Sequence, residues 1–146
     1  MPTSSTPLRA AIAGGVLALA STFTGHATAQ SPSGPIILGT SLPLTGPHAS
    51  TGKEVLSIMQ SYVQRSNQQG GIGGRPLQLV ALDDQFSASQ AELNARRLIE
   101  NGAVALLNCL GTSICNAMLP VLQSSHTPLV GAMAGSGLLR ESSARY

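Results

Sequence analysis

The sequence predicts an α/β fold built on a doubly wound parallel sheet. Short aliphatic runs typical of buried strands alternate with longer segments whose apolar residues recur at helical spacing. Residues 36–42, 103–107 and 128–130 are such runs, and each is followed by Gly, Ser or Thr residues. Because strands that alternate with helices form parallel sheets, these small residues should meet at the carboxyl edge, where open α/β sheets bind ligands.

The first 29 residues have the organisation of a secretory signal peptide. Arg9 supplies a positive flank, residues 10–20 form an apolar stretch too short to span a bilayer, and Ala27-Thr28-Ala29 is a small-x-small cleavage site. We expect cleavage before Gln30 and export of the mature chain to the periplasm. The alternative, a first helix of the fold itself, stays open at this point.

The first strand is predicted at residues 36–42, a continuous apolar run that suits a strand buried on both faces. Residues 53–68 follow as an amphipathic helix. Its apolar positions lie at i, i+4, i+7 and i+8: Val55, Met59, Tyr62 and Val63. Four Gly residues within 70–74 end the helix, because Gly accepts the positive φ that a helix exit and a tight turn require.

The second strand is predicted at residues 77–82. We interpret Asp83 and Asp84, which follow it, as turn and cap residues rather than an acid pair or a metal site, because Asp readily bonds nearby backbone N–H groups. Ser87 and Gln90 fit a capping box, in which Ser87 caps the next helix and the Gln90 side chain reaches back. That helix should bury four residues before Asn101-Gly102 ends it: Ala91, Ala95, Leu98 and Ile99.

The third strand is predicted at residues 103–107 and the fourth at residues 128–131. Between them, a helix from about residue 113 should bury four apolar residues: Ile114, Met118, Val121 and Leu122. Pro120 lies inside this helix, where it must remove a backbone hydrogen bond or kink the helix.

Residues 30–146 are long enough for one small domain with a single core. They contain six acidic and seven basic residues, since Arg9 accounts for the eighth Lys or Arg of the chain. The charges form no block or basic stripe, and Trp is absent. We therefore expect no nucleic-acid partner.

Cys109 and Cys115 flank the loop after the third predicted strand. Export permits a disulfide between them, but so short a loop demands specific geometry; a disulfide and two semi-buried thiols both stay open. The Cys-x5-Cys spacing is wrong for zinc, and His48 and His126 lie on different elements. We expect no metal site and no cofactor.

Short segments in a fixed order carry a family resemblance. They are Ile37-Leu38-Gly39-Thr40-Ser41-Leu42-Pro43-Leu44-Thr45-Gly46-Pro47, Gly70-Gly71-Ile72-Gly73-Gly74-Arg75, Leu82-Asp83-Asp84, Gly111-Thr112-Ser113, Ala117-Met118-Leu119-Pro120-Val121 and Pro128-Leu129-Val130-Gly131. Together they resemble the type I periplasmic solute-binding proteins of branched-chain amino acid (Leu/Ile/Val-type) ABC importers. The resemblance covers essentially all of residues 30–146.

The resemblance implies two Rossmann-like α/β lobes that close on a ligand in the cleft between them. Residues 30–146 would be the N-terminal part of the first lobe, with the hinge and the second lobe absent. It further implies a receptor without enzymatic activity, which captures an amino acid or related small carboxylate and delivers it to an inner-membrane ABC permease. At full length we expect a monomer.

The resemblance also implies a ligand site. Thr112 and Ser113 match the hydroxyl pair that holds the ligand's carboxylate, and residues 131–136 match the loop that completes this pocket. Within that loop, Ala134 stands where many relatives have Thr, and Ser136 is the candidate to replace its contact. Ser50 belongs to the first loop, at the cleft mouth. The partner of the ligand's ammonium group would come from the second lobe.

Other readings compete with a receptor. Gly46-x5-Gly52-Lys53 approaches a phosphate-binding loop, but it is one residue too long and Glu54 stands where Ser or Thr is needed. Gly111-Thr112-Ser113-Ile114-Cys115 approaches the nucleophile elbow of a hydrolase. An exported sensor domain or a hydrolase on the same lobe is therefore the alternative. His48 is open to two interpretations, a ligand contact or a solvated loop residue.

Overall fold

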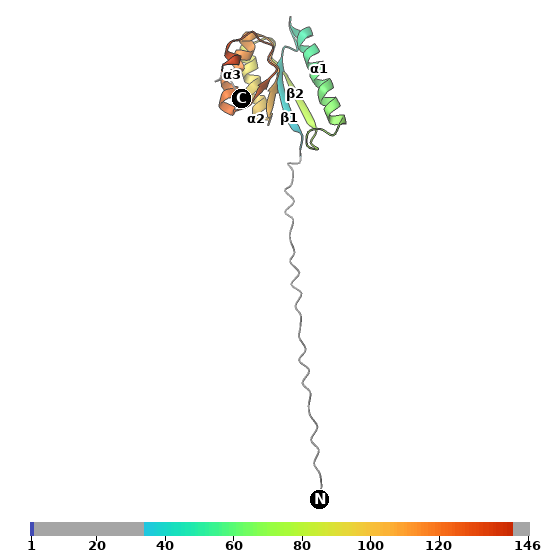
Figure 1. Ribbon diagram of the computed structural model, residues 1–146. Helices are drawn as coiled ribbons and strands as arrows, with labels where there is room; N and C mark the ends of the chain where they lie inside the picture. The colour runs from blue at the N-terminus through green and yellow to red at the C-terminus, as the bar shows by residue number, and fades with distance from the viewer. Residues whose placement is uncertain (2–33, 142–146) are drawn as a thin grey trace. The chain divides into compact units, whose positions relative to one another are not determined.

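The computed structural model describes Met1 and residues 34–141 (Figure 1). Apart from Met1, the predicted signal peptide and its cleavage site lie outside the described residues. Within the described part of the chain, no helix has the length and apolar character needed to cross a membrane.

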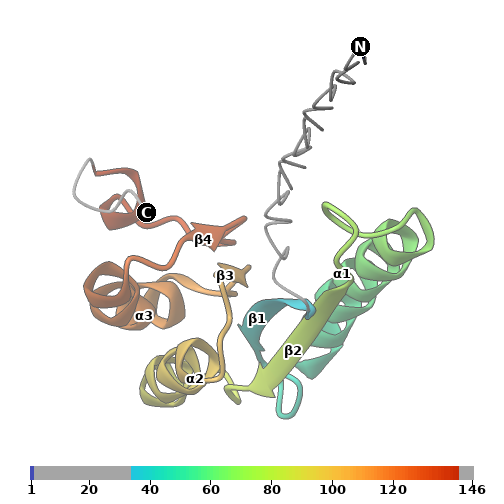
Figure 2. The same cartoon turned by 90° about the horizontal axis from the view of Figure 1, so that it is seen from below.

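The described residues form a four-stranded parallel sheet in the order β2-β1-β3-β4. The elements along the chain are β1 (Ile36–Leu42), α1 (Ala49–Gln68), β2 (Leu77–Asp83), α2 (Ala88–Glu100), β3 (Ala105–Leu107), α3 (Thr112–Ser125), β4 (Leu129–Val130) and the 3-10 helix η1 (Leu138–Arg140). Helix α1 lies on one face of the sheet, and α2 and α3 lie on the other (Figures 1 and 2). The predicted doubly wound α/β fold is confirmed.

The main core lies between the sheet and the pair α2 and α3. It is formed by small and aliphatic residues of both helices, together with Leu106 of β3. Gly39 of β1 suits this packing, because a Cβ atom there would lie 3.1 Å from the Leu98 Cβ atom of α2 and 2.6 Å from the Leu106 Cδ2 atom. Backbone and helix can therefore approach closely at this position.

The buried faces predicted for α2 and α3 are largely confirmed. Ala91, Ala95 and Leu98 of α2 are buried, while Ile99 is half-buried. All four residues predicted for α3 are buried: Ile114, Met118, Val121 and Leu122. Helix α3 continues through Pro120, whose side chain is exposed.

Three local predictions are corrected. Helix α1 begins at Ala49 rather than residue 53, because the Gly52 N–H already donates to the carbonyl of the N-cap residue His48 (3.1 Å). Tyr62 is 69% exposed, whereas Met59 and Val63 are half-buried against the sheet. Strand β3 begins at Ala105 rather than residue 103.

The capping box of α2 is only half present. Ser87 Oγ accepts a hydrogen bond from the Gln90 N–H, as predicted (3.5 Å). The Gln90 side chain does not reach back, because its amide donates to Asn94 Oδ1 (3.0 Å). The Ser87 N–H instead donates to the Asp84 carbonyl (2.7 Å).

Candidate functional site

The loops after β3 and β4 run side by side at the carboxyl edge of the sheet. The Met133 N–H donates to the Cys109 carbonyl (2.9 Å), and the Gly111 N–H donates to the Met133 carbonyl (3.1 Å). The Asn108 N–H donates to the Val130 carbonyl (2.7 Å). Backbone pairing thus extends beyond the two strands and places the start of α3 against the loop after β4.

Helix α3 begins without a side-chain cap. Its N-cap is Gly111, with φ 101°, and the next two residues, Thr112 and Ser113, are exposed. The first N–H groups of a helix lack intrahelical partners and carry the positive end of the helix dipole. Two hydroxyl groups and these donors therefore occupy one small exposed area, which is chemistry suited to a carboxylate.

The hydroxyl group of Thr112 joins α3 to the loop after β4. Thr112 Oγ1 accepts a hydrogen bond from the Gly135 N–H (3.3 Å). A hydroxyl group that accepts one hydrogen bond can still donate its own proton. Thr112 can therefore hold the loop and contact a ligand at the same time.

Ala134 and Ser136 have side chains in a different environment. Ala134 packs against the buried core, and Ser136 is only 5% exposed. Both line a cavity of about 290 Å³ beside α3, together with Leu122 and Arg140. The structure brings their loop to Thr112 through the Gly135 backbone, while their side chains line this separate cavity.

Ser50, the remaining predicted ligand residue, is exposed in the first turn of α1. Helix α1 covers the face of the sheet opposite to α3 (Figure 2). Ser50 therefore lies on the helix that covers the face opposite to α3.

Cys109 and Cys115 form a disulfide. Of the two alternatives left open by the sequence, the bonded one is present. Both residues are fully buried in the core beneath α3. The cross-link spans Gly111, Thr112 and Ser113, so it encloses the start of the helix.

An aromatic pair, which the sequence did not predict, lies beside the start of α3, with the Phe86 ring against Gly111. The His48 and Phe86 rings stack with centroids 4.0 Å apart. A Cβ atom on Gly111 would lie 3.0 Å from the Phe86 ring. The sequence offered one signal, since Phe86 is one of two Phe residues and lies in a polar loop, but its φ of 58° and its contact with Gly111 depend on the fold.

Asp83 and Asp84 have the turn roles predicted for them. Asp83 Oδ1 accepts hydrogen bonds from the Leu44 N–H (2.8 Å) and the Gln85 N–H (2.9 Å), and Asp83 Oδ2 accepts one from Thr45 Oγ1 (2.6 Å). Desolvation opposes ionisation of Asp83, but these donors together hold its pKa below the usual range. Asp83 thus fixes the loop after β1 to the loop after β2.

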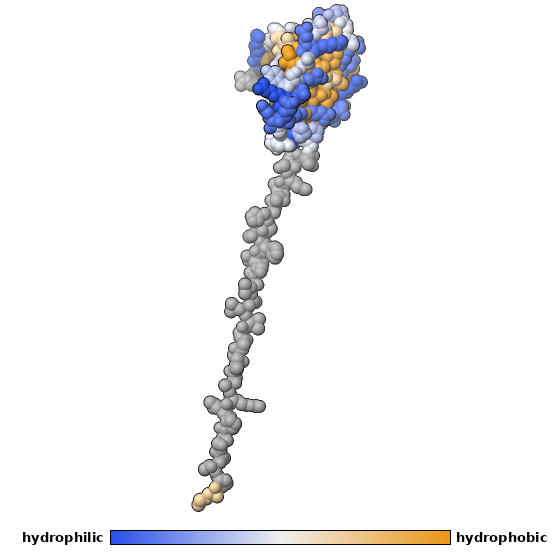
Figure 3. Space-filling model, turned by 90° about the vertical axis from the view of Figure 1, so that its right-hand side faces the viewer, coloured by the Kyte–Doolittle hydropathy of each residue, from blue (hydrophilic) through white to orange (hydrophobic). Residues whose placement is uncertain are grey.

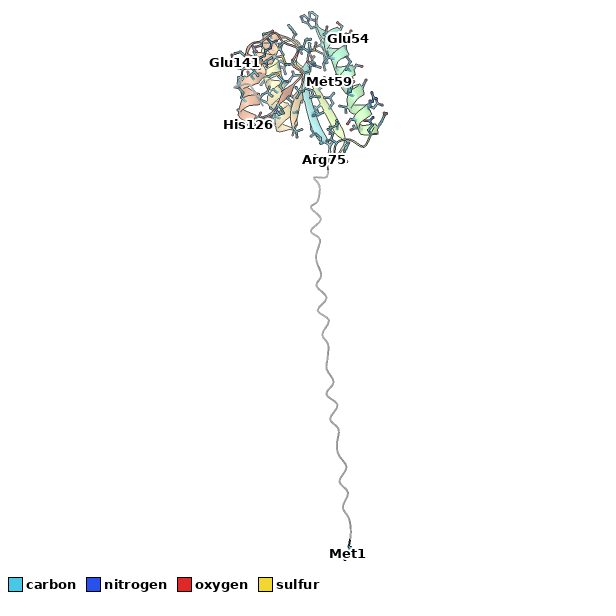
Figure 4. All side chains as sticks on the ribbon, viewed as in Figure 1. Met1, Glu54, Met59, Arg75, His126 and Glu141 are labelled. Atoms are coloured by element: carbon cyan, nitrogen blue, oxygen red, sulfur yellow. A yellow bond between two sulfur atoms is a disulfide. The ribbon has the colours of Figure 1, made fainter. Side chains whose placement is uncertain are left out.

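The described residues have the arrangement needed neither for a metal site nor for catalysis by a Ser113–His126 pair. Residues 34–141 contain no group of three or more His, Cys, Asp or Glu residues that could hold a metal ion. His126 is the C-cap of α3, so about 20 Å of helix separates it from Ser113. In Figure 4, His126 lies on the opposite side of the folded part from Glu54, which is near the start of α1. His126 therefore cannot act as a general base for Ser113.

Comparisons with known proteins agree on one family. The model of a periplasmic binding protein family matches residues 35–146. No curated protein matches the sequence.

Solved structures share the fold. A crystal structure from Rhodopirellula baltica SH 1, described as a possible leucine/isoleucine/valine-binding protein, is 26% identical over 75% of this chain and 30% of its own, with a TM-score of 0.70. A substrate-binding periplasmic protein from Ralstonia solanacearum is 36% identical over 69% of this chain and 30% of its own (TM-score 0.67). The substrate-binding protein LivJ from Streptococcus pneumoniae, solved with isoleucine, has the same fold at 21% identity, over 73% of this chain and 31% of its own (TM-score 0.69).

The chain thus spans about a third of the length of these structures. The family match covers most of the sequence. The four-stranded sheet, its helices and the uncapped start of α3 all lie within the matched residues. This chain belongs to the periplasmic binding protein family, whose members are solute-binding proteins.

Proposed function

We propose that this chain supplies the carboxylate-binding part of an exported solute receptor for a branched-chain amino acid or a related small carboxylate. The observation that carries the proposal is the uncapped start of α3, where Thr112 and Ser113 are exposed and the Gly135 N–H fixes the neighbouring loop. A carboxylate placed there gains hydrogen bonds from backbone and hydroxyl donors as well as the helix dipole.

The ligand class is supported by the comparisons. The R. baltica structure is described as a possible leucine/isoleucine/valine-binding protein, and its identity to this chain is 26%. These amino acids share an α-carboxylate, which is the group that the start of α3 suits. In this proposal a second lobe binds the ammonium group, and residues 30–146 are the N-terminal part of the first lobe.

The cellular context follows from the same proposal. Residues 1–29 act as a cleaved signal peptide, and the mature receptor works in the periplasm as a monomer when its second lobe is present. Its partner is an inner-membrane ABC permease, which accepts the ligand from the closed receptor. Capture and release need no cofactor or catalytic residue.

Replacement of Ser113 tests the site. Hydrogen bonds to a charged group contribute roughly 1.5–3 kcal/mol each, so Ser113→Ala should weaken binding of L-leucine about tenfold or more without unfolding the lobe. Ser124→Ala is the matched control, because Ser124 is exposed at the other end of α3. Both variants are compared by titration calorimetry, ideally in a version of the protein that carries a second lobe. Equal affinities for the two variants would place the carboxylate site elsewhere.

A further inference from the structure

We propose that the Cys109–Cys115 disulfide is a positioning device, which holds the start of α3 in the conformation that binds a carboxylate. The inference rests on the proposed function and extends it to two residues that do not contact the ligand. It assigns the cross-link a role in affinity in addition to its contribution to stability.

The disulfide anchors the binding turn at both of its ends. Cys109 follows β3 and Cys115 lies in the first turns of α3, and both are fully buried. Between them, Thr112 and Ser113 are exposed. The part of the loop that would meet the ligand is therefore accessible, while its two ends are fixed in the core.

The loop needs such an anchor because of Gly111. Gly is the most permissive residue of the backbone, and at φ 101° it offers no side-chain cap to the helix. The first helical hydrogen bond, from the Cys115 N–H to the Gly111 carbonyl (3.0 Å), closes inside the ring formed by the disulfide. A covalent link across this position removes conformations in which the first turn is unwound and its donors point apart.

Other contacts hold Gly111 without a covalent bond. The Phe86 ring lies over Gly111, and the Met133 carbonyl accepts its N–H. Both contacts come from loops, which open locally at low free-energy cost. The disulfide is thus the one covalent constraint on the start of α3 among the described residues. Pre-ordering donors before the ligand arrives raises affinity, because the ligand no longer bears the cost of ordering them.

The burial of both cysteines indicates that the disulfide is permanent rather than readily exchanged with other thiols. Thiol–disulfide exchange requires access of a thiolate to a sulfur atom, and both residues are 0% exposed. The bond should therefore persist once it has formed in an oxidising compartment.

The test separates positioning from stability. The Cys109→Ala/Cys115→Ala double variant is compared with Val121→Ala, a truncation of a buried residue near the other end of the same helix. Affinity for L-leucine is measured from the chemical shifts of the Thr112 and Ser113 amides. Hydrogen exchange is measured at residues 115–117, which begin with the first hydrogen-bonded amide of α3. If the double variant fails to fold, the wild-type chain is reduced with a phosphine in urea, so that the buried sulfur atoms become accessible, and is then refolded in the presence of the reductant for the same comparison.

We expect the double variant to bind L-leucine at least about fivefold more weakly, which is the scale of a helix-dipole contribution, and to exchange its amides at 115–117 faster. Val121→Ala should lower the melting temperature and leave both properties unchanged. A double variant with a lower melting temperature but wild-type affinity and exchange would overturn the inference. If the wild-type chain showed no leucine shifts at Thr112 and Ser113, the proposed function would fail. Unchanged exchange at residues 115–117 in the double variant would independently refute the positioning role of the disulfide.

Discussion

At the residue scale, a buried carboxyl group connects the sheet to the loop that carries Phe86. Asp84 is fully buried; its Oδ2 accepts a hydrogen bond from Ser41 Oγ (3.0 Å), and its Oδ1 accepts one from the Phe86 N–H (2.9 Å). Asn94 of α2 donates to the same Ser41 Oγ (3.1 Å). Desolvation raises the pKa of Asp84, and the nearby charge of Asp83 adds to this, although the two donors oppose it.

The two neighbouring carboxyl groups, Asp83 and Asp84, should contribute to the stability of the folded state in different pH ranges. A raised pKa in the folded state favours the protonated form, so the stability linked to Asp84 is fully present below its ordinary pKa of about 4 and is lost as the pH rises through the raised value. The lowered pKa of Asp83 has the opposite effect, and its contribution is lost as the pH falls below about 4.

Asp84→Asn tests this assignment. The amide can accept from the Phe86 N–H and donate to Ser41, so the network survives without a titrating group. Between pH 4 and pH 7, the unfolding free energy of the variant should fall less with rising pH than that of the wild type, as measured by urea denaturation. Parallel profiles for the two proteins over this range would show that Asp84 does not titrate there.

At the element scale, features that depend on the sequence of one segment were predicted correctly, whereas features that depend on the choice of a bonding partner were not. The bounds of β1 and the buried face of α3 were correct because continuous apolar runs and helical spacing are properties of the segment itself. The start of α1 was missed because its N-cap, His48, makes no side-chain cap bond. The Gln90 side chain donates to Asn94 instead of reaching back to the Ser87 backbone. The capping-box motif does not determine which of these two nearby partners Gln90 takes.

The candidate site was predictable to a similar degree. The presence of Thr112 and Ser113 after a strand and at a helix start could be read from the sequence, and the structure places both there. The contact of Phe86 with Gly111 joins two loops, so no local pattern could indicate it. The side chains of Ala134 and Ser136 line a cavity beside α3, which depends on how their loop packs rather than on its sequence.

Gly111→Ala tests the entry to α3. The residue has φ 101° and would place a Cβ atom 3.0 Å from the Phe86 ring, whereas Gly131 has φ 75° and open space around it. Gly131→Ala should therefore cost only the strain of the left-handed backbone, about 1–2 kcal/mol. Gly111→Ala should cost more in thermal or urea unfolding, and Phe86→Ala in the same chain should restore part of the difference. Equal losses for the two single variants would mean that Phe86 does not press on Gly111.

At the scale of the whole described unit, the two faces of the sheet are covered unequally. Helices α2 and α3 cover one face, whereas α1 contacts mainly β2 and β1 on the other. Val104 and Val130, next to β3 and in β4, are more than half exposed. Figure 3, which shows the α1 side, has hydrophobic residues gathered between hydrophilic ones. Exposed apolar surface beside an edge strand favours self-association.

A purified protein of residues 30–146 should therefore self-associate at high concentration. Val130→Lys places a charge on the edge strand β4 and should reduce the mean mass in sedimentation experiments. Leu93→Lys is the matched control, because Leu93 is an exposed apolar residue of α2, on the covered side. Similar reductions in mean mass for both variants would indicate a general effect of added charge rather than self-association through the exposed face of the sheet.

Amide chemical-shift mapping of residues 30–146 tests whether a ligand carboxylate binds at the start of α3. With one lobe, affinity for L-leucine should be no better than about millimolar, near −4 kcal/mol, which this measurement can detect. We expect L-leucine to shift the amides of residues 111–114 and 133–135, and L-leucinamide, which lacks the carboxylate, to leave them unchanged. Shifts confined to the cavity lined by Leu122 and Arg140, or equal shifts with both compounds, would contradict it.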